Sequence, residues 1–225
     1  MTEATRILAI RHGQTAWNAD GRIQGHKDIA LDATGKLQAD RLAAALAGEE
    51  LHAIYSSDLS RALQTAAPLQ CRSGAPLHTD SGLRERAFGE FEGLSFAQIE
   101  QRWPVQAMRW RQRDPGFGPG GGENLVRFRD RVLGAVDRLA HAHRGQAIAL
   151  VTHGGVLDLL YRAATHLPLQ APRSWSVDNA SINRLLHSDQ GLALVGWADV
   201  GHLDSACHEA QQVAVELPRH SSSEV

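Results

Sequence analysis

The stretch that decides the fold is Ile7-Leu8-Ala9-Ile10, which runs directly into Arg11-His12-Gly13. A short apolar run that stops at polar residues and glycine predicts a buried strand. The same pattern returns at residues 146–151, where a second apolar run ends at Thr152-His153-Gly154-Gly155. Ligands of open α/β sheets bind beyond the carboxyl ends of the strands, so both histidines are expected at a functional edge.

Strand-like and helix-like patterns alternate along the rest of the chain. Further strands are predicted at residues 53–55, 181–187 and 192–197. The clearest helix has one apolar stripe, made by Leu125, Phe128, Val132, Val136 and Leu139. Another helix is expected to begin at a cap at Thr34, to carry Leu37, Leu42 and Leu46, and to end at Gly48. Three more helices are expected over 59–69, from a cap at Ser95 to Pro104, and over 156–164.

This alternation predicts an α/β fold, a three-layer sandwich with a mostly parallel central sheet. Residues 86–122 are expected to form an inserted, cap-like segment over one end of that sheet. No linker divides the chain, so residues 1–207 are expected to form a single α/β domain. The polar residues 208–225 predict a flexible C-terminal tail.

Composition narrows the classes of partner. The 225 residues include 23 basic and 25 acidic ones, a formal net charge of −2, so neither nucleic acid nor an anionic membrane is an expected partner. The apolar runs are too short to span a bilayer, and no signal peptide is evident at the start. Cys71 and Cys207 show no C-x-x-C spacing, which favours a reduced, cytoplasmic protein.

The 12 histidines and the excess of arginine over lysine point either to a metal site or to an anion site. Spacing does not support a metal, because His141 and His143 lie two residues apart and do not share a helix face. A literal G-x-G-x-x-G at residues 116–121 is not preceded by a strand, which argues against a dinucleotide. We therefore expect neither a metal nor a cofactor.

An anion site fits the two strand ends better. The glycines after His12 and His153 leave backbone N–H groups open, and the helix expected after His153 points its positive end there. Arg11 offers a planar fork suited to phosphate, and Arg61 at a helix start is positioned to join it. Taken singly, each residue has an ordinary alternative, as a loop histidine or a solvated arginine.

Five motifs in order make the chain resemble the histidine phosphatase superfamily, also called the phosphoglycerate mutase-like superfamily. The resemblance runs from Ile7 to about Asn183. The motifs are RHGQTAWN at 11–18, GHKDIAL at 25–31 with Gly35, SSDLSRA at 56–62 with Thr65-Ala66, LRE at 83–85 with FGEFEG at 88–93, and THGG at 152–155.

The resemblance implies a role for each motif residue. His12 is the implied nucleophile, which forms a phosphohistidine, and Glu85 is the implied proton donor and acceptor. Arg11, Arg61 and His153 are implied to hold the transferring phosphoryl group. Phosphate contacts with less support from the pattern are Asn18, Gln24, Gly25 and Gly154. These types suit phosphoryl transfer, which needs in-line positioning and positive charge around the phosphoryl oxygens.

The same site serves a phosphatase or a 2,3-bisphosphoglycerate-dependent mutase. The cap segment here, with a Trp110, an Asp114-Pro115 and a Gly-Gly-Glu at 121–123, is more like the phosphatase branch. The expected function is hydrolysis of small phosphorylated metabolites, with the mutase as the alternative and a non-catalytic phosphate-binding module as a third. Four cap arginines either bind a second anionic group or line a solvated helix face, namely Arg102, Arg109, Arg111 and Arg113. The sequence does not determine the oligomeric state, and it is compatible with a homodimer.

Overall fold

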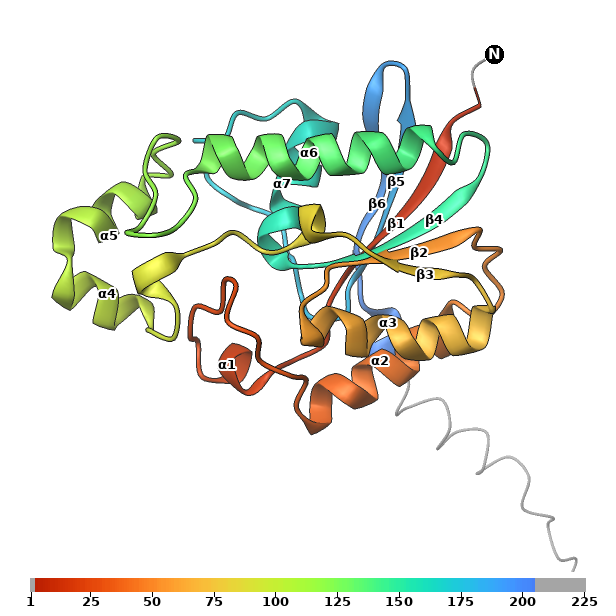
Figure 1. Ribbon diagram of the computed structural model, residues 1–225, viewed down its shortest axis with the longest axis horizontal. Helices are drawn as coiled ribbons and strands as arrows, with labels where there is room; N and C mark the ends of the chain where they lie inside the picture. The colour runs from red at the N-terminus through yellow and green to blue at the C-terminus, as the bar shows by residue number, and fades with distance from the viewer. Residues whose placement is uncertain (1–2, 205–225) are drawn as a thin grey trace, which may run out of the picture.

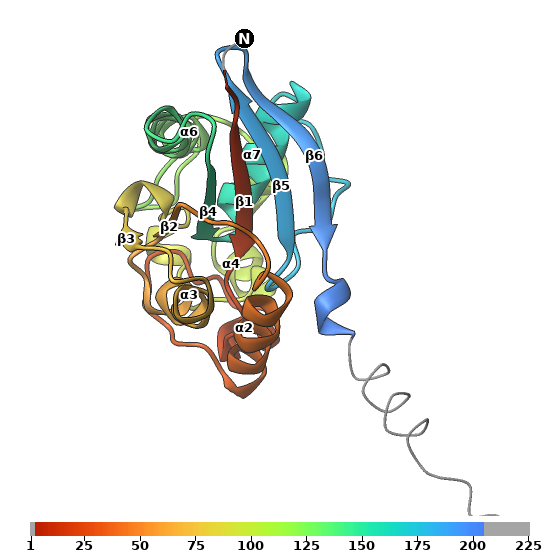
Figure 2. The same ribbon diagram turned by 90° about the vertical axis from the view of Figure 1, so that its right-hand side faces the viewer.

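The computed structural model describes residues 3–204 of the chain, which contain one six-stranded sheet in the order β3-β2-β4-β1-β5-β6. The strands are β1 (Thr5–Arg11), β2 (Ala53–Ser56), β3 (Leu77–Thr79), β4 (Ala147–Thr152), β5 (Ile182–Ser188) and β6 (Gly191–Asp199). The pairs β1–β4, β2–β4 and β2–β3 are parallel, whereas β5 and β6 are added antiparallel at one side (Figure 2). The predicted mostly parallel sheet is confirmed.

The register of the two central strands sets the position of both motif histidines. In the β1–β4 pair, Arg11 lies opposite Thr152, so His12 and His153 leave adjacent strands at the same level. The backbone N–H of His12 donates to the Thr152 carbonyl and continues the ladder by one step. The two histidines, 141 residues apart in sequence, are therefore neighbours because of strand pairing alone.

Helices cover both faces of the sheet (Figure 1). They are α1 (Ala16–Ala19), α2 (Ala33–Ala45), α3 (Ser60–Ser73), α4 (Phe96–Arg102), α5 (Pro104–Arg111), α6 (Leu125–His141) and α7 (Gly154–Thr165). Figure 1 shows α6 and α7 on one side of the sheet and α2 and α3 on the other. The result is the expected three-layer sandwich.

β1 is apolar on both sides because it faces a core in each direction. Ile7 and Ala9 belong to the apolar cluster beneath α6 and α7, whereas Leu8 and Ile10 belong to the cluster beneath α2 and α3. Successive side chains of a strand point to opposite faces, so a strand between two helical layers reads as a continuous apolar run. That run is what made the strand visible in the sequence.

The inserted segment forms a third, smaller core beyond the carboxyl ends of the parallel strands, where α4 and α5 lie (Figure 1). Four buried side chains hold it together, namely Phe91, Ile99, Ala107 and Phe117. The predicted cap at Ser95 is confirmed, since its hydroxyl accepts from the N–H of Gln98. Pro104 ends α4 as expected and also begins α5, because a proline is tolerated in the first turn of a helix.

Two predictions on helices have different outcomes. The apolar stripe of α6 is confirmed, since all five predicted residues are buried. The cap at Thr34 is wrong: Asp32 caps α2 and accepts from the N–H of Gly35, and Leu37 is 51% exposed rather than buried. The edge strand β3 was not predicted.

The expectations for the polar tail at 208–225 and for Cys207 lie outside the described residues. Within residues 3–204, no helix combines the length and apolarity needed to cross a membrane.

The cap of α2 gives a stability prediction. Asp32→Ala removes the side chain that accepts from Gly35 N–H at 2.7 Å, so the free energy of unfolding falls by about 1 kcal/mol in urea titrations. The matched control is Thr34→Ala, in the exposed first turn of the same helix. A larger loss in Thr34→Ala than in Asp32→Ala would contradict the assignment of the cap.

Candidate active site

A cavity of about 240 Å³ opens at the carboxyl ends of β1 and β4. Eight of the nine residues predicted for the site line it, namely Arg11, His12, Asn18, Gln24, Gly25, Arg61, Glu85 and Gly154. The ninth, His153, is not in its lining and lies buried beside His12, with ring centroids 5.1 Å apart. We call this cavity the phosphate pocket, for the ligand that the sequence predicts.

His12 is held as a neutral imidazole in one tautomer. Its Nδ1 lies 2.7 Å from the carbonyl oxygen of Gly13, which only a protonated Nδ1 can bond, so Nε2 carries the free lone pair. The side chain is 3% exposed. Burial, and then the charges of Arg11 and Arg61, hold the pKa of His12 well below its usual value.

Arg11 presents an unused donor inside the pocket. Its Nη1 donates to the carbonyl of Val177 at 2.5 Å, whereas its buried Nε has no hydrogen-bond partner among the described residues. Burial lowers the pKa of Arg11, and the negative charges of Glu85 and Asp178 partly offset this. A buried N–H group of a cation without an acceptor is costly, so it marks a place for an anion.

Arg61 is nearly fully buried, at 1% exposure. Its Nη groups donate to the carbonyls of Lys27 and Gly25 at 2.9 and 2.8 Å, and its Nε lies 3.3 Å from Nδ1 of His153. Within the described part of the chain, these bonds use three of its five N–H groups and leave two. Burial lowers its pKa to about 10, so it stays charged at neutral pH.

His153 connects Arg61 to the edge of the sheet. Its Nδ1 accepts from Arg61, and its Nε2 lies 2.8 Å from the hydroxyl of Ser57. Burial, and then the charge of Arg61, hold the pKa of His153 well below its usual value. Both ring nitrogens are therefore engaged, and a direct contact with a phosphoryl group requires Nε2 to exchange Ser57 for a phosphoryl oxygen.

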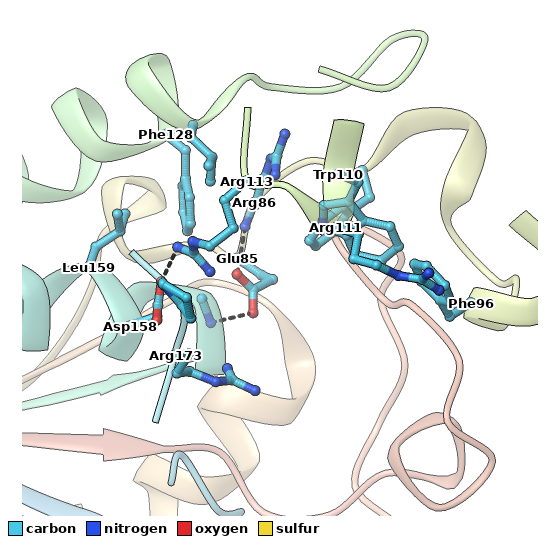
Figure 3. Close-up of a pocket in the computed structure, with 14 residues that line it drawn as sticks. Glu85, Arg86, Phe96, Trp110, Arg111, Arg113, Phe128, Asp158, Leu159 and Arg173 are labelled. Atoms are coloured by element: carbon cyan, nitrogen blue, oxygen red, sulfur yellow. Dashed lines mark hydrogen bonds and ion pairs between the residues drawn. The ribbon is translucent and has the colours of Figure 1, made fainter. Parts of the chain in front are cut away.

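Glu85 also lines the pocket, and its carboxylate lies at the start of α7 (Figure 3). One carboxylate oxygen accepts from the N–H of Gly155 at 2.9 Å, and the other from the N–H of Arg86 at 2.8 Å. His26, to which the sequence assigned no role, bonds the Glu85 carbonyl at 2.8 Å through Nε2. Hydrogen bonds therefore fix both the carboxylate and the backbone carbonyl of Glu85.

Gly155 is required for that arrangement. A Cβ built at residue 155 would collide with Oε1 of Glu85. The glycine in the THGG motif therefore serves two purposes: it offers an N–H group at the helix start and lets the carboxylate approach.

Asn18 is oriented by a residue that the sequence did not reveal. Oδ1 of Asn18 accepts from the backbone N–H and the hydroxyl of Thr15 and from Nδ2 of Asn179. The amide NH₂ of Asn18 has no hydrogen-bond partner among residues 3–204. Asn179 also donates to the His12 carbonyl at 3.0 Å. Gln24 is buried and its Oε1 has no hydrogen-bond partner within residues 3–204.

The lining of the phosphate pocket suits an anion rather than a metal ion. Arg11, Arg61, Arg22 and Arg173 line it against one carboxylate, that of Glu85. In the described part of the chain, one group has the composition of a metal site: Asp137 and His141 of α6 with His187 of β5, whose ligand atoms lie within 4.8 Å of one another. None of these three lines the pocket, and the His187–Asp137 contact at 3.0 Å already pairs two of them.

Comparison with known proteins agrees with the motif order. A family model described as "Histidine phosphatase superfamily (branch 1)" matches residues 7–200. A metal-independent phosphoserine phosphatase of Arabidopsis thaliana is 38% identical over 208 residues, 91% of this chain and 85% of the relative. Phosphoglycerate mutase-like protein 4 of the same plant is 38% identical over 204 residues, with 88% and 86% covered.

Solved structures carry the same fold. The structure of a mycobacterial glucosyl-3-phosphoglycerate phosphatase aligns with a TM-score of 0.78 at 32% identity and covers 87% of this chain and 99% of that one. The expected fold class is therefore confirmed by structural likeness as well as by topology.

The close approach at residue 155 predicts a loss of activity. Gly155→Ala pushes the Glu85 carboxylate out of place, so kcat for a phosphate monoester with a poor leaving group falls roughly 100-fold, the usual contribution of a positioned acid. The control is Gly134→Ala in α6, where the added methyl meets open space. Unchanged kcat in Gly155→Ala would refute this placement of Glu85.

The two buried histidines predict how stability depends on pH. Below about pH 6.5 the unfolded chain protonates both His12 and His153, whereas the folded chain holds them neutral, so stability falls as pH falls. Each contributes a slope of up to about 1.4 kcal/mol per pH unit. His12→Asn should reduce the measured slope by one such increment in urea titrations between pH 5 and 6, and an unchanged slope would contradict burial of a neutral His12.

Proposed function

The chain belongs to the histidine phosphatase superfamily, branch 1, and is an enzyme that hydrolyses phosphate monoesters, and we propose that it does so through a phosphohistidine on His12. The observation that carries this proposal is the pair of guanidiniums that line the pocket with the free Nε2 of His12, Arg61 being buried and Arg11 half-buried. Arg11 has an unpartnered Nε and Arg61 has two unused N–H groups, and no carboxylate within residues 3–204 is hydrogen-bonded to either.

In the first step Nε2 of His12 attacks phosphorus in line with the ester oxygen. The N–P bond forms as the P–O bond breaks, and the Nδ1–H bond to Gly13 stabilises the positive charge that develops on the ring. The lowered pKa of His12 keeps its lone pair available at neutral pH. Arg11 and Arg61 hold the phosphoryl oxygens, with the Asn18 amide and the Gly154 N–H as further donors.

His153 contributes in two ways in this scheme. It orients Arg61 through Nδ1, and its Nε2–H exchanges the Ser57 hydroxyl for a phosphoryl oxygen as negative charge moves onto the phosphoryl group. Gln24 and Gly25 form the wall of the pocket, where the Gly25 carbonyl fixes Arg61.

Glu85 handles the protons of both steps. An alkoxide leaves poorly, so the protonated carboxyl of Glu85 gives its proton to the departing oxygen, and an alcohol is released. The resulting carboxylate then takes a proton from water, and the water oxygen attacks the phosphohistidine. Inorganic phosphate leaves, and His12 returns to the neutral state. Positive charge comes from guanidinium groups in this scheme, so the reaction needs no metal ion.

Hydrolysis is favoured over the mutase alternative. Relatives at similar identity include proteins named as phosphatases, although another is named as mutase-like. Small phosphorylated metabolites are the proposed substrates, and neither nucleic acid nor a membrane is a proposed partner. A single domain over residues 1–207, a cytoplasmic location and a homodimer stay predictions.

One assay separates the two activities. With 3-phosphoglycerate, the wild-type enzyme should release inorganic phosphate and form little 2-phosphoglycerate, and EDTA should not change the rate. His12→Ala should lower hydrolysis of p-nitrophenyl phosphate by at least about 1,000-fold, as expected for a lost nucleophile. Efficient isomerisation with negligible phosphate release would overturn the phosphatase assignment. Wild-type turnover at the background rate, and no higher than that of His12→Ala, would indicate a non-catalytic binding module.

A further inference from the structure

Two histidines and one aspartate lie together at the end of α6, outside the phosphate pocket. Asp137 and His141 belong to α6 and His187 to β5, and the atoms that they offer as ligands lie within 4.8 Å of one another. The rings of His141 and His187 meet edge to face, with centroids 5.1 Å apart. We call these three residues the α6–β5 cluster.

The helix period and the strand pleat explain why the three side chains meet. Asp137 and His141 are four residues apart on α6, so both lie on the same face of the helix. His187 follows Leu185 by two residues, on the face of β5 that packs beneath α6 and α7. Because 50 positions separate Asp137 from His187, the spacing of histidines along the sequence does not reveal the cluster.

The distances in the α6–β5 cluster fit a tetrahedral metal ion. Oδ1 of Asp137 lies 3.0 Å from Nε2 of His187 and 3.3 Å from Nδ1 of His141. Zinc bonds to nitrogen and oxygen are about 2.1 Å long, so two ligand atoms of a zinc tetrahedron are about 3.4 Å apart. Both contacts of the carboxylate are close to this spacing, and the 43% exposed side chain of His141 has room for the remaining adjustment.

Asp137 has only histidines as ion-pair partners in the described part of the chain. Neighbouring acids are instead paired with arginines, Asp130 with Arg129 and Asp189 with Arg144. With both imidazoles neutral, the cluster therefore combines one negative charge with nitrogen lone pairs. A divalent cation would satisfy both.

A cavity of about 410 Å³ lies beside the cluster. Asp137 and His187 line it, together with His166 directly after α7 and Gln190 in the turn between β5 and β6. Open zinc sites have three protein ligands and a water in the fourth position. The cavity offers room for that water beside the carboxylate and the buried imidazole.

A metal ion must compete with one hydrogen bond of the cluster. Nδ1 of His141 lies 2.8 Å from the carbonyl oxygen of Asp137. Coordination through Nδ1 would replace this bond, whereas coordination through Nε2 would keep it. The second mode is the usual one for a zinc-bound histidine, whose other ring N–H donates to a carbonyl or a carboxylate.

We propose that Asp137, His141 and His187 bind a divalent metal ion of the zinc type, which ties the last turn of α6 to β5. Two imidazoles and a carboxylate are ligands that zinc accepts, whereas calcium and magnesium prefer oxygen ligands. None of the three residues lines the phosphate pocket, so the ion takes no part in the proposed hydrolysis. Its effect is on stability, because an ion that binds only the folded chain shifts the folding equilibrium.

Matched double variants test the proposal. Asp137→Asn/His141→Ala removes two ligands at exposed positions, and the control Asp130→Asn/His78→Ala removes the same charge and one imidazole from exposed residues outside the cluster. In calorimetry with Zn²⁺, the wild type and the control should have a tightest site of equal affinity. Affinity should fall at least about 100-fold in Asp137→Asn/His141→Ala, since loss of even an outer-shell partner costs 10- to 100-fold.

Nuclear magnetic resonance of the histidine rings identifies the ligands directly. Zn²⁺ should shift the ring ¹⁵N signals of both His141 and His187 in the wild type. Equal zinc affinity in all three proteins, shifts that leave either histidine unchanged, or no zinc binding by the wild type would overturn the proposal. Both double variants should hydrolyse p-nitrophenyl phosphate as the wild type does, so the outcome is separate from the phosphatase assignment.

Discussion

The burial of positive charge at the carboxyl ends of β1 and β4 is the constraint on which the rest of the site depends. Arg61 is buried and Arg11 is half-buried, and both are bonded to backbone carbonyls and, for Arg61, to an imidazole rather than to carboxylates. Removing a guanidinium from water costs several kcal/mol unless strong partners replace the lost hydration. Carbonyl dipoles supply part of that compensation, and a bound phosphoryl group would supply the rest. Burial of the imidazoles themselves, and then the charges of the nearby arginines, lower the pKa of His12 and of His153 and hold both neutral.

This arrangement explains why the catalytic residues come from distant parts of the chain. Parallel pairing brings His12 beside His153, and the helix that follows His153 turns its first N–H groups toward Glu85. Loops at the same edge supply the carbonyls of Gly25 and Val177. The sheet thus fixes the positions of the two histidines. The loops at the same edge of the sheet provide hydrogen-bond donors and acceptors whose positions depend on it.

The features that could be predicted from the sequence are those set by residues close to one another along the chain. His12 and His153 could be predicted because each follows an apolar run and precedes a glycine, and the α6 stripe because its period is unmistakable. The cap at Thr34 was wrong because Asp32 and Thr34 are both good capping types two residues apart, and the sequence has no means to choose between them. The three-residue edge strand β3 is too short for a periodic signal.

The residues that the sequence did not reveal, Asn179 and Arg173, both lie outside the helices and strands, where no periodic pattern marks them. Asn179 bonds residues more than 150 positions away, and Arg173 lies in a segment with no helix or strand. The sequence grouped Arg113 with three other cap arginines. Arg113 differs from them in its backbone, because it lies in the turn beyond the end of α5 with a positive φ. Such contacts follow from the packing of loops on the finished sheet and leave no periodic pattern.

The most direct test of the account is to locate the phosphoryl group on the enzyme. In Glu85→Gln, p-nitrophenyl phosphate needs no acid to expel its leaving group, but water lacks its base, so the phosphoenzyme should accumulate. Quenching in alkali, where phosphohistidine survives, followed by peptide mass spectrometry should place the phosphoryl group on His12. A phosphoryl group on another residue, or none during a measurable burst of p-nitrophenol, would contradict the account.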